Sequence, residues 1–191
     1  MNWYVLRVKI NYENDVLEAL KKRLDPEVYK PFIPKKTYPH TKGGELLNTV
    51  KKICFPGYVF IETEKIGSIV IKDTEFVISG ISGVHFFLSY NDNKNEDGSQ
   101  QTEYVMREAE KNALKVFLDD DFLIGPSVGF TEGERVKITS GPFVGYEGAV
   151  KSINKRRMTA VISIGMFGTI VDTTIMLIDA KRSGEAGNEF K

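Results

Sequence analysis

The sequence has few of the residues on which disulfides and metal sites depend. Its 191 residues include one cysteine, Cys54, and two histidines, His40 and His85. A single cysteine excludes an internal disulfide and a cysteine-rich zinc site, and it fits a reducing cytosol. Neither histidine has a cysteine or a second histidine near it at ligand spacing. We therefore expect no metal and no cofactor.

Long apolar runs and export signals are missing as well. No stretch of about 18 apolar residues is present, so no membrane span is expected. The N-terminus alternates like a strand and lacks the basic region and apolar core of a signal peptide. A cytoplasmic location is predicted.

No set of catalytic residues emerges from the sequence. It has no phosphate-loop signature and no evident Ser/His pair. An enzyme that uses lysines near His40 is one alternative, but no second catalytic partner is visible. Three adjacent carboxylates, Asp119 to Asp121, cannot converge on a metal without a partner loop and are interpreted as solvated. A protein that binds, and is not an enzyme, is expected.

The chain also has no excess of either charge sign: it holds 26 basic and 26 acidic residues. This balance argues against a strongly basic nucleic-acid coat. The average hides a division: residues 131–182 carry 8 basic and 5 acidic residues, a net charge of +3. Local patches therefore matter more than the mean.

Apolar periodicity predicts an α+β fold in two parts. Residues 1–118 have the pattern of an N-terminal α/β domain, 119–130 of a linker, 131–182 of a small five-stranded β-barrel, and 183–191 of a flexible tail. The expected elements of the first part are a strand at 3–10, a helix over Val16–Leu24, a hairpin at 35–52, a strand from Tyr58, a short helix at 63–73, strand–turn–strand over 76–88, a loop at 90–102 and a helix over 102–116.

The strand from Tyr58 has an unusual beginning, Phe55-Pro56-Gly57-Tyr58. Pro56 removes a backbone donor and Gly57 has no side chain to pack, just where pairing should start. Two aromatic rings flank this weak point. The residues alone indicate an irregular strand start.

At "CFPGYVFIE" and "VKITSGPFVGYEGAVKSI" the sequence resembles the NusG family of transcription elongation factors. The first stretch is similar to the family's Phe-Pro-Gly-Tyr motif, and the second, with Gly141, Pro142, Phe143 and Gly148, to its KOW motif. Their order matches too, as does the opening Trp3-Tyr4-Val5. The resemblance covers roughly 3–118 and 131–179. It implies an N-terminal domain that docks on the clamp helices of RNA polymerase beside upstream DNA, and a tethered KOW domain for RNA or protein.

The resemblance implies polymerase-binding roles for Phe55, Tyr58 and Trp3. Rings in an apolar surface groove would receive a polymerase helix, burying much area with few rotors. Ordinary core packing is the alternative explanation, and it would be favoured if the family were set aside.

Two lysine- and arginine-rich segments are candidates for nucleic-acid contact. Lys35, Lys36 and Lys42 belong to the basic hairpin, which would touch upstream DNA or polymerase; a solvated hairpin that protects a sheet edge is an equal alternative. In the KOW domain we expect one RNA-binding patch, or else a soluble turn, formed by Lys151, Lys155, Arg156, Arg157, Lys181 and Arg182. Phe143, Met166 and Phe167 are candidates for a KOW partner contact, with a cap on the barrel ranked first.

Within the family, "KPFIPKKTY" and "FPGYVFIET" resemble the specialised LoaP branch, which implies antitermination in long operons through a nascent RNA hairpin. The family's usual Arg-x-Thr-Pro and Phe-Gly-Arg stretches are replaced here by Val77-Ile78-Ser79-Gly80 and Met166-Phe167-Gly168-Thr169. The alternatives are a general housekeeping factor and a ribosomal or RNA-scaffold protein. A monomer is expected.

Overall fold

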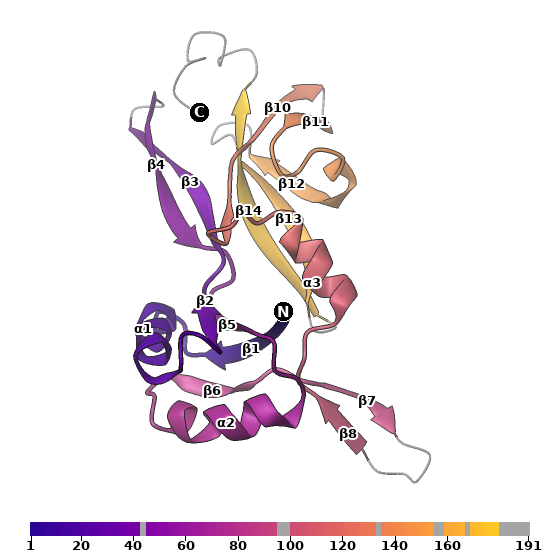
Figure 1. The fold of residues 1–191 in the computed structure, drawn as a ribbon. Helices are drawn as coiled ribbons and strands as arrows, with labels where there is room; N and C mark the ends of the chain where they lie inside the picture. The colour runs from indigo at the N-terminus through magenta and orange to yellow at the C-terminus, as the bar shows by residue number, and fades with distance from the viewer. Residues whose placement is uncertain (43–44, 95–99, 133–134, 155–158, 167–168, 180–191) are drawn as a thin grey trace. The chain divides into compact units, whose positions relative to one another are not determined.

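The computed structural model describes residues 1–42, 45–94, 100–132, 135–154, 159–166 and 169–179 (Figure 1). Backbone contacts divide the chain into two compact units. Unit 1 consists of Met1–Ile33, Phe55–Asn112 and Gly165–Thr169, and unit 2 of Pro34–Cys54, Ala113–Ile164 and Ile170–Lys191. The division does not follow the predicted linear boundaries, which remain a prediction.

Unit 1 is built on a four-stranded antiparallel sheet in the order β2-β5-β1-β6. Its strands are β1 (Asn2–Val8), β2 (Lys30–Phe32), β5 (Tyr58–Thr63) and β6 (Val84–Phe87). The middle strands β1 and β5 are buried along most of their length. In their pairing, Tyr4, Val5 and Leu6 stand opposite Ile61, Phe60 and Val59. This double burial explains why both strands are nearly continuous apolar runs.

Two helices of unit 1 pack with this sheet, α1 (Glu13–Arg23) and α2 (Ser68–Ser79) (Figure 1). Helix α1 buries Val16, Leu17 and Leu20, the apolar stripe that its spacing predicted. Its last turn is basic, which complements the partial negative charge at a helix C-terminus. A third helix, α3 (Glu108–Lys115), spans the boundary between the two units.

The structure corrects three expected elements of this part. Residues 76–79, predicted as strand, form the last turn of α2, which ends before Gly80. The expected loop at 90–102 contains a hairpin, β7 (Tyr90–Lys94) and β8 (Gln100–Glu103), whose polar strands carry no apolar alternation. The last helix begins at Glu108 and not at residue 102.

Apart from the end of β13 and the first residue of β14, unit 2 contains a five-stranded sheet in the order β11-β10-β14-β13-β12. Its strands are β10 (Ser127–Glu132), β11 (Arg135–Ser140), β12 (Val150–Asn154), β13 (Thr159–Met166) and β14 (Thr169–Asp179), with a 3-10 turn η1 at Glu147–Ala149. Strand β10 is antiparallel to β11 and parallel to β14. The predicted α+β class is confirmed, and β10 begins inside the segment 119–130 that was expected to be a linker.

Unit 2 also holds the predicted hairpin, β3 (Lys35–Lys42) and β4 (Glu45–Ile53). The two strands pair antiparallel along their whole length, with one register shift between His40 and Thr41. A short strand, β9 (Leu123–Ile124), adds to β3 in parallel at Lys35 and Lys36. Among the described residues, every helix is too short or too polar to cross a bilayer.

Candidate functional site

The Phe-Pro-Gly-Tyr segment makes a tight turn that is held by unit 1. Gly57 has φ +85°, and a side chain there would bring Cβ within 2.6 Å of Arg7 Nη1. Its backbone N–H donates to Glu13 Oε1 at 2.6 Å, and its carbonyl accepts from Val8 N at 2.9 Å. Glycine is therefore required both for the left-handed conformation and for the close approach of Arg7.

Trp3 and Phe55 lie in the interior. Each is 1% exposed. The Trp3 indole is edge-on to Phe32 with the ring centroids 5.2 Å apart, and Phe55 lies 6.2 Å from Phe60. Trp3 Nε1 also donates to Glu62 Oε2 at 2.9 Å, which satisfies its only polar atom. In this conformation neither ring is accessible to a partner protein. Both make the contacts that ordinary core packing would give.

Tyr58 lies at the edge of this cluster and is half-buried. It stands opposite Arg7 on β1, whose guanidinium lies over the tyrosine ring at 4.6 Å. On the other side Arg7 stands opposite Phe86 of β6, which is 59% exposed. Because residues directly opposite in a sheet project to the same face, these three side chains form a row across it, termed the Tyr58 row.

Sequence reasoning missed Arg7 and Phe86 as members of this row. Residues two apart in a strand share a face, so the sequence did contain a signal that Arg7 lies on the face of Trp3. Phe86 gave no such signal, because its place depends on the register between β1 and β6, which shifts between Arg7 and Val8. Pairing register in a sheet is not a property of a single strand.

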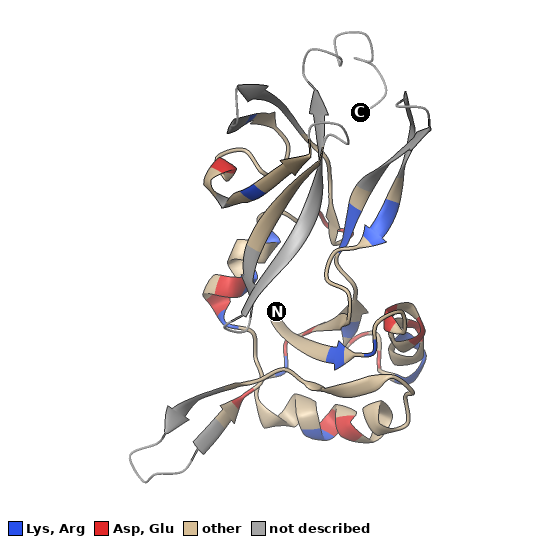
Figure 2. Cartoon of the chain, turned by 180° about the vertical axis from the view of Figure 1, so that it is seen from behind, with Lys and Arg blue, Asp and Glu red and all other residues tan. Residues whose placement is uncertain are grey.

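The base of the hairpin β3–β4 gathers lysines from both strands. Lys36 stands opposite Lys52, and Lys35 and Lys51 neighbour this pair. Burial lowers the pKa of Lys36; the nearby Cys54 acts against that effect and the Lys52 charge adds to it. Figure 2 shows the basic segments at this base. The side chain of Lys42 lies outside the described residues.

The KOW candidates are only partly described. Lys151 is exposed on β12. Lys155, Arg156, Arg157, Lys181, Arg182 and Phe167, and the side chain of Met166, lie outside the described residues. The predicted basic patch therefore stays a prediction.

Phe143 is buried within unit 2. Its ring is 0% exposed and stacks on Phe117 with the centroids 4.6 Å apart. Its backbone N–H donates to Ser127 Oγ at 3.2 Å. This placement agrees with the barrel-cap interpretation. The neighbouring Val144 and Tyr146 are 49% and 38% exposed.

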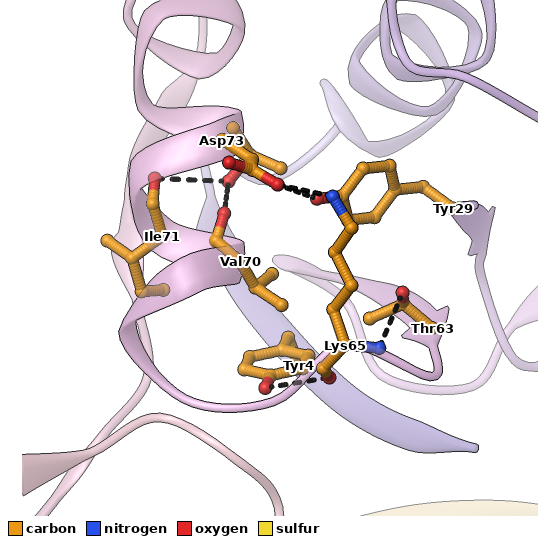
Figure 3. A network of polar contacts seen from close by, with 8 residues as sticks. Tyr4, Tyr29, Thr63, Lys65, Val70, Ile71 and Asp73 are labelled. Atoms are coloured by element: carbon orange, nitrogen blue, oxygen red, sulfur yellow. Dashed lines mark hydrogen bonds and ion pairs between the residues drawn. The ribbon is translucent and has the colours of Figure 1, made fainter.

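A polar network fixes the connection between β5 and α2 (Figure 3). Lys65 Nζ lies 2.5 Å from Asp73 Oδ2, and the Tyr29 hydroxyl donates to the same oxygen at 2.9 Å. The Tyr4 hydroxyl donates to the Lys65 carbonyl at 3.3 Å. The Lys65 ammonium, and then Tyr29, lower the pKa of Asp73, and Asp73 raises the pKa of Lys65. Burial, and then Asp73, raise the pKa of Tyr29.

No metal site is formed by the part of the chain that the structure describes, where no group of three or more His, Cys, Asp or Glu side chains converges. Cys54 is buried and its thiol is not part of a disulfide.

Comparison with known families accounts for both parts of the chain. The sequence model of the NusG family, described as transcription termination factor nusG, matches residues 1–114, more than half of the chain. The chain belongs to the NusG family. A KOW motif matches residues 132–164, and the NusG-type turn at Phe55–Tyr58 lies within the first match.

Individual proteins of the NusG family share just over a quarter of their aligned residues with this chain. The transcription termination/antitermination protein NusG of Bacillus subtilis (strain 168) is 27% identical over 172 residues, 87% of this chain and 90% of that protein. The protein of the same name from Staphylococcus aureus (strain N315) is 28% identical over 171 residues, 87% of each chain. A solved structure titled "Domain interaction in Thermotoga maritima NusG" covers 92% of this chain and 93% of its own at 21% identity, with a TM-score of 0.46.

Proposed function

We propose that the chain is a transcription elongation and antitermination factor that binds RNA polymerase with its N-terminal domain and nascent RNA with its KOW domain. The observation that carries the proposal is the presence of the NusG and KOW matches in this order on one chain. The two bacterial relatives carry termination and antitermination in their names. The factor would act by binding, favouring the forward state of the polymerase and suppressing pausing or termination, with no chemical step.

The Tyr58 row is the surface proposed to meet the clamp helices of the polymerase. It offers a half-buried tyrosine, an exposed phenylalanine and a guanidinium between them, the residue types that dominate protein interfaces. Trp3 and Phe55, which pack around Phe60 on the same face of the sheet, would support this row from the side without touching the partner. Monomeric action is expected, since the partner and not a second copy would cover the row.

The KOW domain is proposed to capture an RNA hairpin with Lys151, Lys155, Arg156, Arg157, Lys181 and Arg182. Arginine donates two hydrogen bonds to one phosphate from a planar fork. Because the KOW domain is tethered to the N-terminal domain, binding the RNA there would raise the local concentration of the RNA beside the factor. Lys35, Lys36 and Lys42 of the hairpin β3–β4 are the proposed contact to upstream DNA or to the polymerase, since Lys36 stands opposite Lys52 and lysines of both strands lie at the base of the hairpin.

A LoaP-type antiterminator and a housekeeping NusG-type factor remain two versions of this proposal. The stretches that resemble LoaP favour the first. In the second version, proteins are the partners of the KOW domain. Specific binding of the free chain to one RNA hairpin separates them, because only the first version requires it.

In vitro transcription through a terminator tests the proposal. Templates carry candidate leader hairpins, and matched templates carry the same leader with the hairpin stem disrupted. The antiterminator version predicts more read-through on the intact leader alone. Equal read-through on both leaders supports the housekeeping version. No effect on any template, together with no binding to polymerase, would contradict both.

A further inference from the structure

Glu13 carries a buried carboxylate at the beginning of helix α1. It is 2% exposed and is the first residue of the helix. An acidic residue in the first turn is favourable because the helix N-terminus is partly positive. That effect does not require burial, and Asp15 in the same turn is exposed. A carboxylate withdrawn from water is costly unless a partner compensates it, so the burial of Glu13 needs a separate explanation.

The partner of this carboxylate is the Phe-Pro-Gly-Tyr turn. Glu13 Oε1 accepts a buried hydrogen bond from the Gly57 N–H at 2.6 Å, across 44 residues of sequence. On the other side of the same residue, the Gly57 carbonyl accepts from Val8 N at 2.9 Å and from Arg7 Nη1 at 3.4 Å. Gly57 is therefore held from both sides, by Glu13 through its N–H and by β1 through its carbonyl.

The direction of the Gly57 carbonyl affects the Tyr58 row through Arg7. The Arg7 guanidinium contacts this carbonyl through Nη1 and lies over the Tyr58 ring at 4.6 Å. Glycine adopts many backbone conformations, so the turn does not keep φ +85° at Gly57 by itself. A hydrogen bond from outside the turn restricts it, and Glu13 makes that bond.

The segment that leads into Glu13 is itself held firmly. Lys9 N donates to the Gly83 carbonyl at 2.7 Å, and Tyr12 N donates to the Lys9 carbonyl at 3.0 Å. The Tyr12 ring packs so closely on Gly83 that an added Cβ there would lie 2.6 Å from Tyr12 Cδ1. Lys9 Nζ also lies over the Tyr12 ring at 4.7 Å. The carboxylate is thus presented by a rigid connection, which is what a positioning group requires.

We propose that Glu13 is a positioning residue for the Tyr58 row. Through Gly57 it sets the Arg7 guanidinium on the Tyr58 ring before any partner binds, and it does not touch the partner. A surface that is already ordered loses less conformational freedom on binding, so the contact is tighter. The inference rests on the proposed function only for the identity of the partner, the polymerase. The effect of Glu13 on Arg7 does not depend on it.

Two measurements on the full chain test the inference. The first is the NMR shift of the Arg7 side-chain protons caused by the Tyr58 ring, with Tyr58→Leu as the reference that lacks the ring. The second is a binding titration with polymerase. Glu13→Ala should lose the ring shift at Arg7 and bind about tenfold more weakly, the effect of losing one hydrogen bond to a charged group. Glu13→Gln, whose amide oxygen can still accept from Gly57, should keep the shift and most of the affinity.

Two further variants separate positioning from stability and from charge. Glu13→Asp keeps the acid at the start of α1 but shortens the side chain by one methylene, so it should behave like Glu13→Ala. It also decides the matter if Glu13→Ala does not fold, as judged by circular dichroism. Asp15→Ala removes the exposed acid of the same turn and should change neither measurement.

The inference is overturned if folded Glu13→Ala or Glu13→Asp keeps both the Arg7 shift and full affinity. It is also overturned if Asp15→Ala weakens binding as much as they do, since the effect would then be one of helix charge. If the wild type does not bind polymerase, the proposed function fails. The Arg7 shift in the Glu13 variants then still decides whether Glu13 positions the row.

Discussion

Phe55 and Tyr58 are three residues apart in one motif, but they occupy different environments. The first is 1% exposed among aromatic rings, and the second is half-buried beneath the Arg7 guanidinium. A role in recognition and a role in stability can therefore be separated by substitution.

Phe55→Ala should lower the free energy of unfolding by about 3–5 kcal/mol, because it leaves a cavity in the core. Tyr58→Ala should lower it by about 1 kcal/mol, the usual cost of a half-exposed change, but should weaken polymerase binding. Urea denaturation and a binding titration with polymerase measure the two effects. If Phe55→Ala were no more destabilising than Tyr58→Ala, the buried position of Phe55 would be wrong.

Gly57 offers a second prediction at this scale. Gly57→Ala introduces a side chain at φ +85° and 2.6 Å from Arg7 Nη1, so it should cost about 1–2 kcal/mol of stability and displace Arg7 from Tyr58. The control is Gly67→Ala, also at positive φ (+65°) but with no atom within 4 Å of the new Cβ. Both variants should lose stability in thermal unfolding. Weaker polymerase binding is expected for Gly57→Ala alone. If both variants bound polymerase equally weakly, a role for Arg7 in binding would be contradicted.

Among the elements, the connection from β5 to α2 depends on charge and therefore on pH. Asp73 has a lowered pKa in the folded chain, so its stabilising contribution is present above the unfolded pKa, about 3.9, and is lost as the pH falls through the folded value. Lys65 and Tyr29 have raised pKa values, so their contributions are present below their unfolded pKa values, near pH 10, and are lost as the pH rises through the folded ones. The network should stabilise the fold most between these limits.

The expected result is a stability difference between the wild type and Asp73→Asn that is largest near neutral pH and shrinks toward pH 3. Urea unfolding at a series of pH values measures it. Glu75→Gln, on the same helix, is the control for a general change of charge. A difference that stayed constant over the acidic range would show that Asp73 does not act through its ionised form.

Elements with strong apolar periodicity could be predicted from the sequence, and others could not. The spacing of Val16, Leu17 and Leu20 specified α1, and the alternation from Trp3 specified β1. Helix α2 was cut short in the prediction because Phe76 is apolar, although its ring is exposed. The hairpin β7–β8 was missed because polar strands without a buried face show no alternation.

The same limit applied to the candidate site. Aromatic residues in the Phe-Pro-Gly-Tyr motif could be recognised from the sequence, but burial separates Phe55 from Tyr58. Burial depends on contacts between distant segments, here Phe32, Phe55 and Phe60.

At the scale of the whole molecule, zero net charge restricts nucleic-acid binding to local patches. The proposed contact to RNA lies on the KOW lysines and arginines, and the proposed contact to upstream DNA on the base of the hairpin β3–β4. Each released counterion steepens the dependence of affinity on salt. The KOW patch should therefore affect the salt dependence of RNA binding, and the hairpin patch the salt dependence of DNA binding.

The double variant Arg156→Gln, Arg157→Gln should weaken binding to the RNA hairpin and reduce the slope of log affinity against log salt by about two, roughly one for each phosphate that is no longer neutralised. The matched variant Lys35→Gln, Lys36→Gln removes the same charge from the other patch. It should leave the RNA slope unchanged but reduce crosslinking to upstream DNA within an elongation complex. Filter binding over a range of salt concentrations gives the slopes. If both variants changed the RNA slope equally, RNA affinity would depend on the total positive charge of the chain and not on one patch. The assignment of RNA binding to the KOW domain would then be wrong.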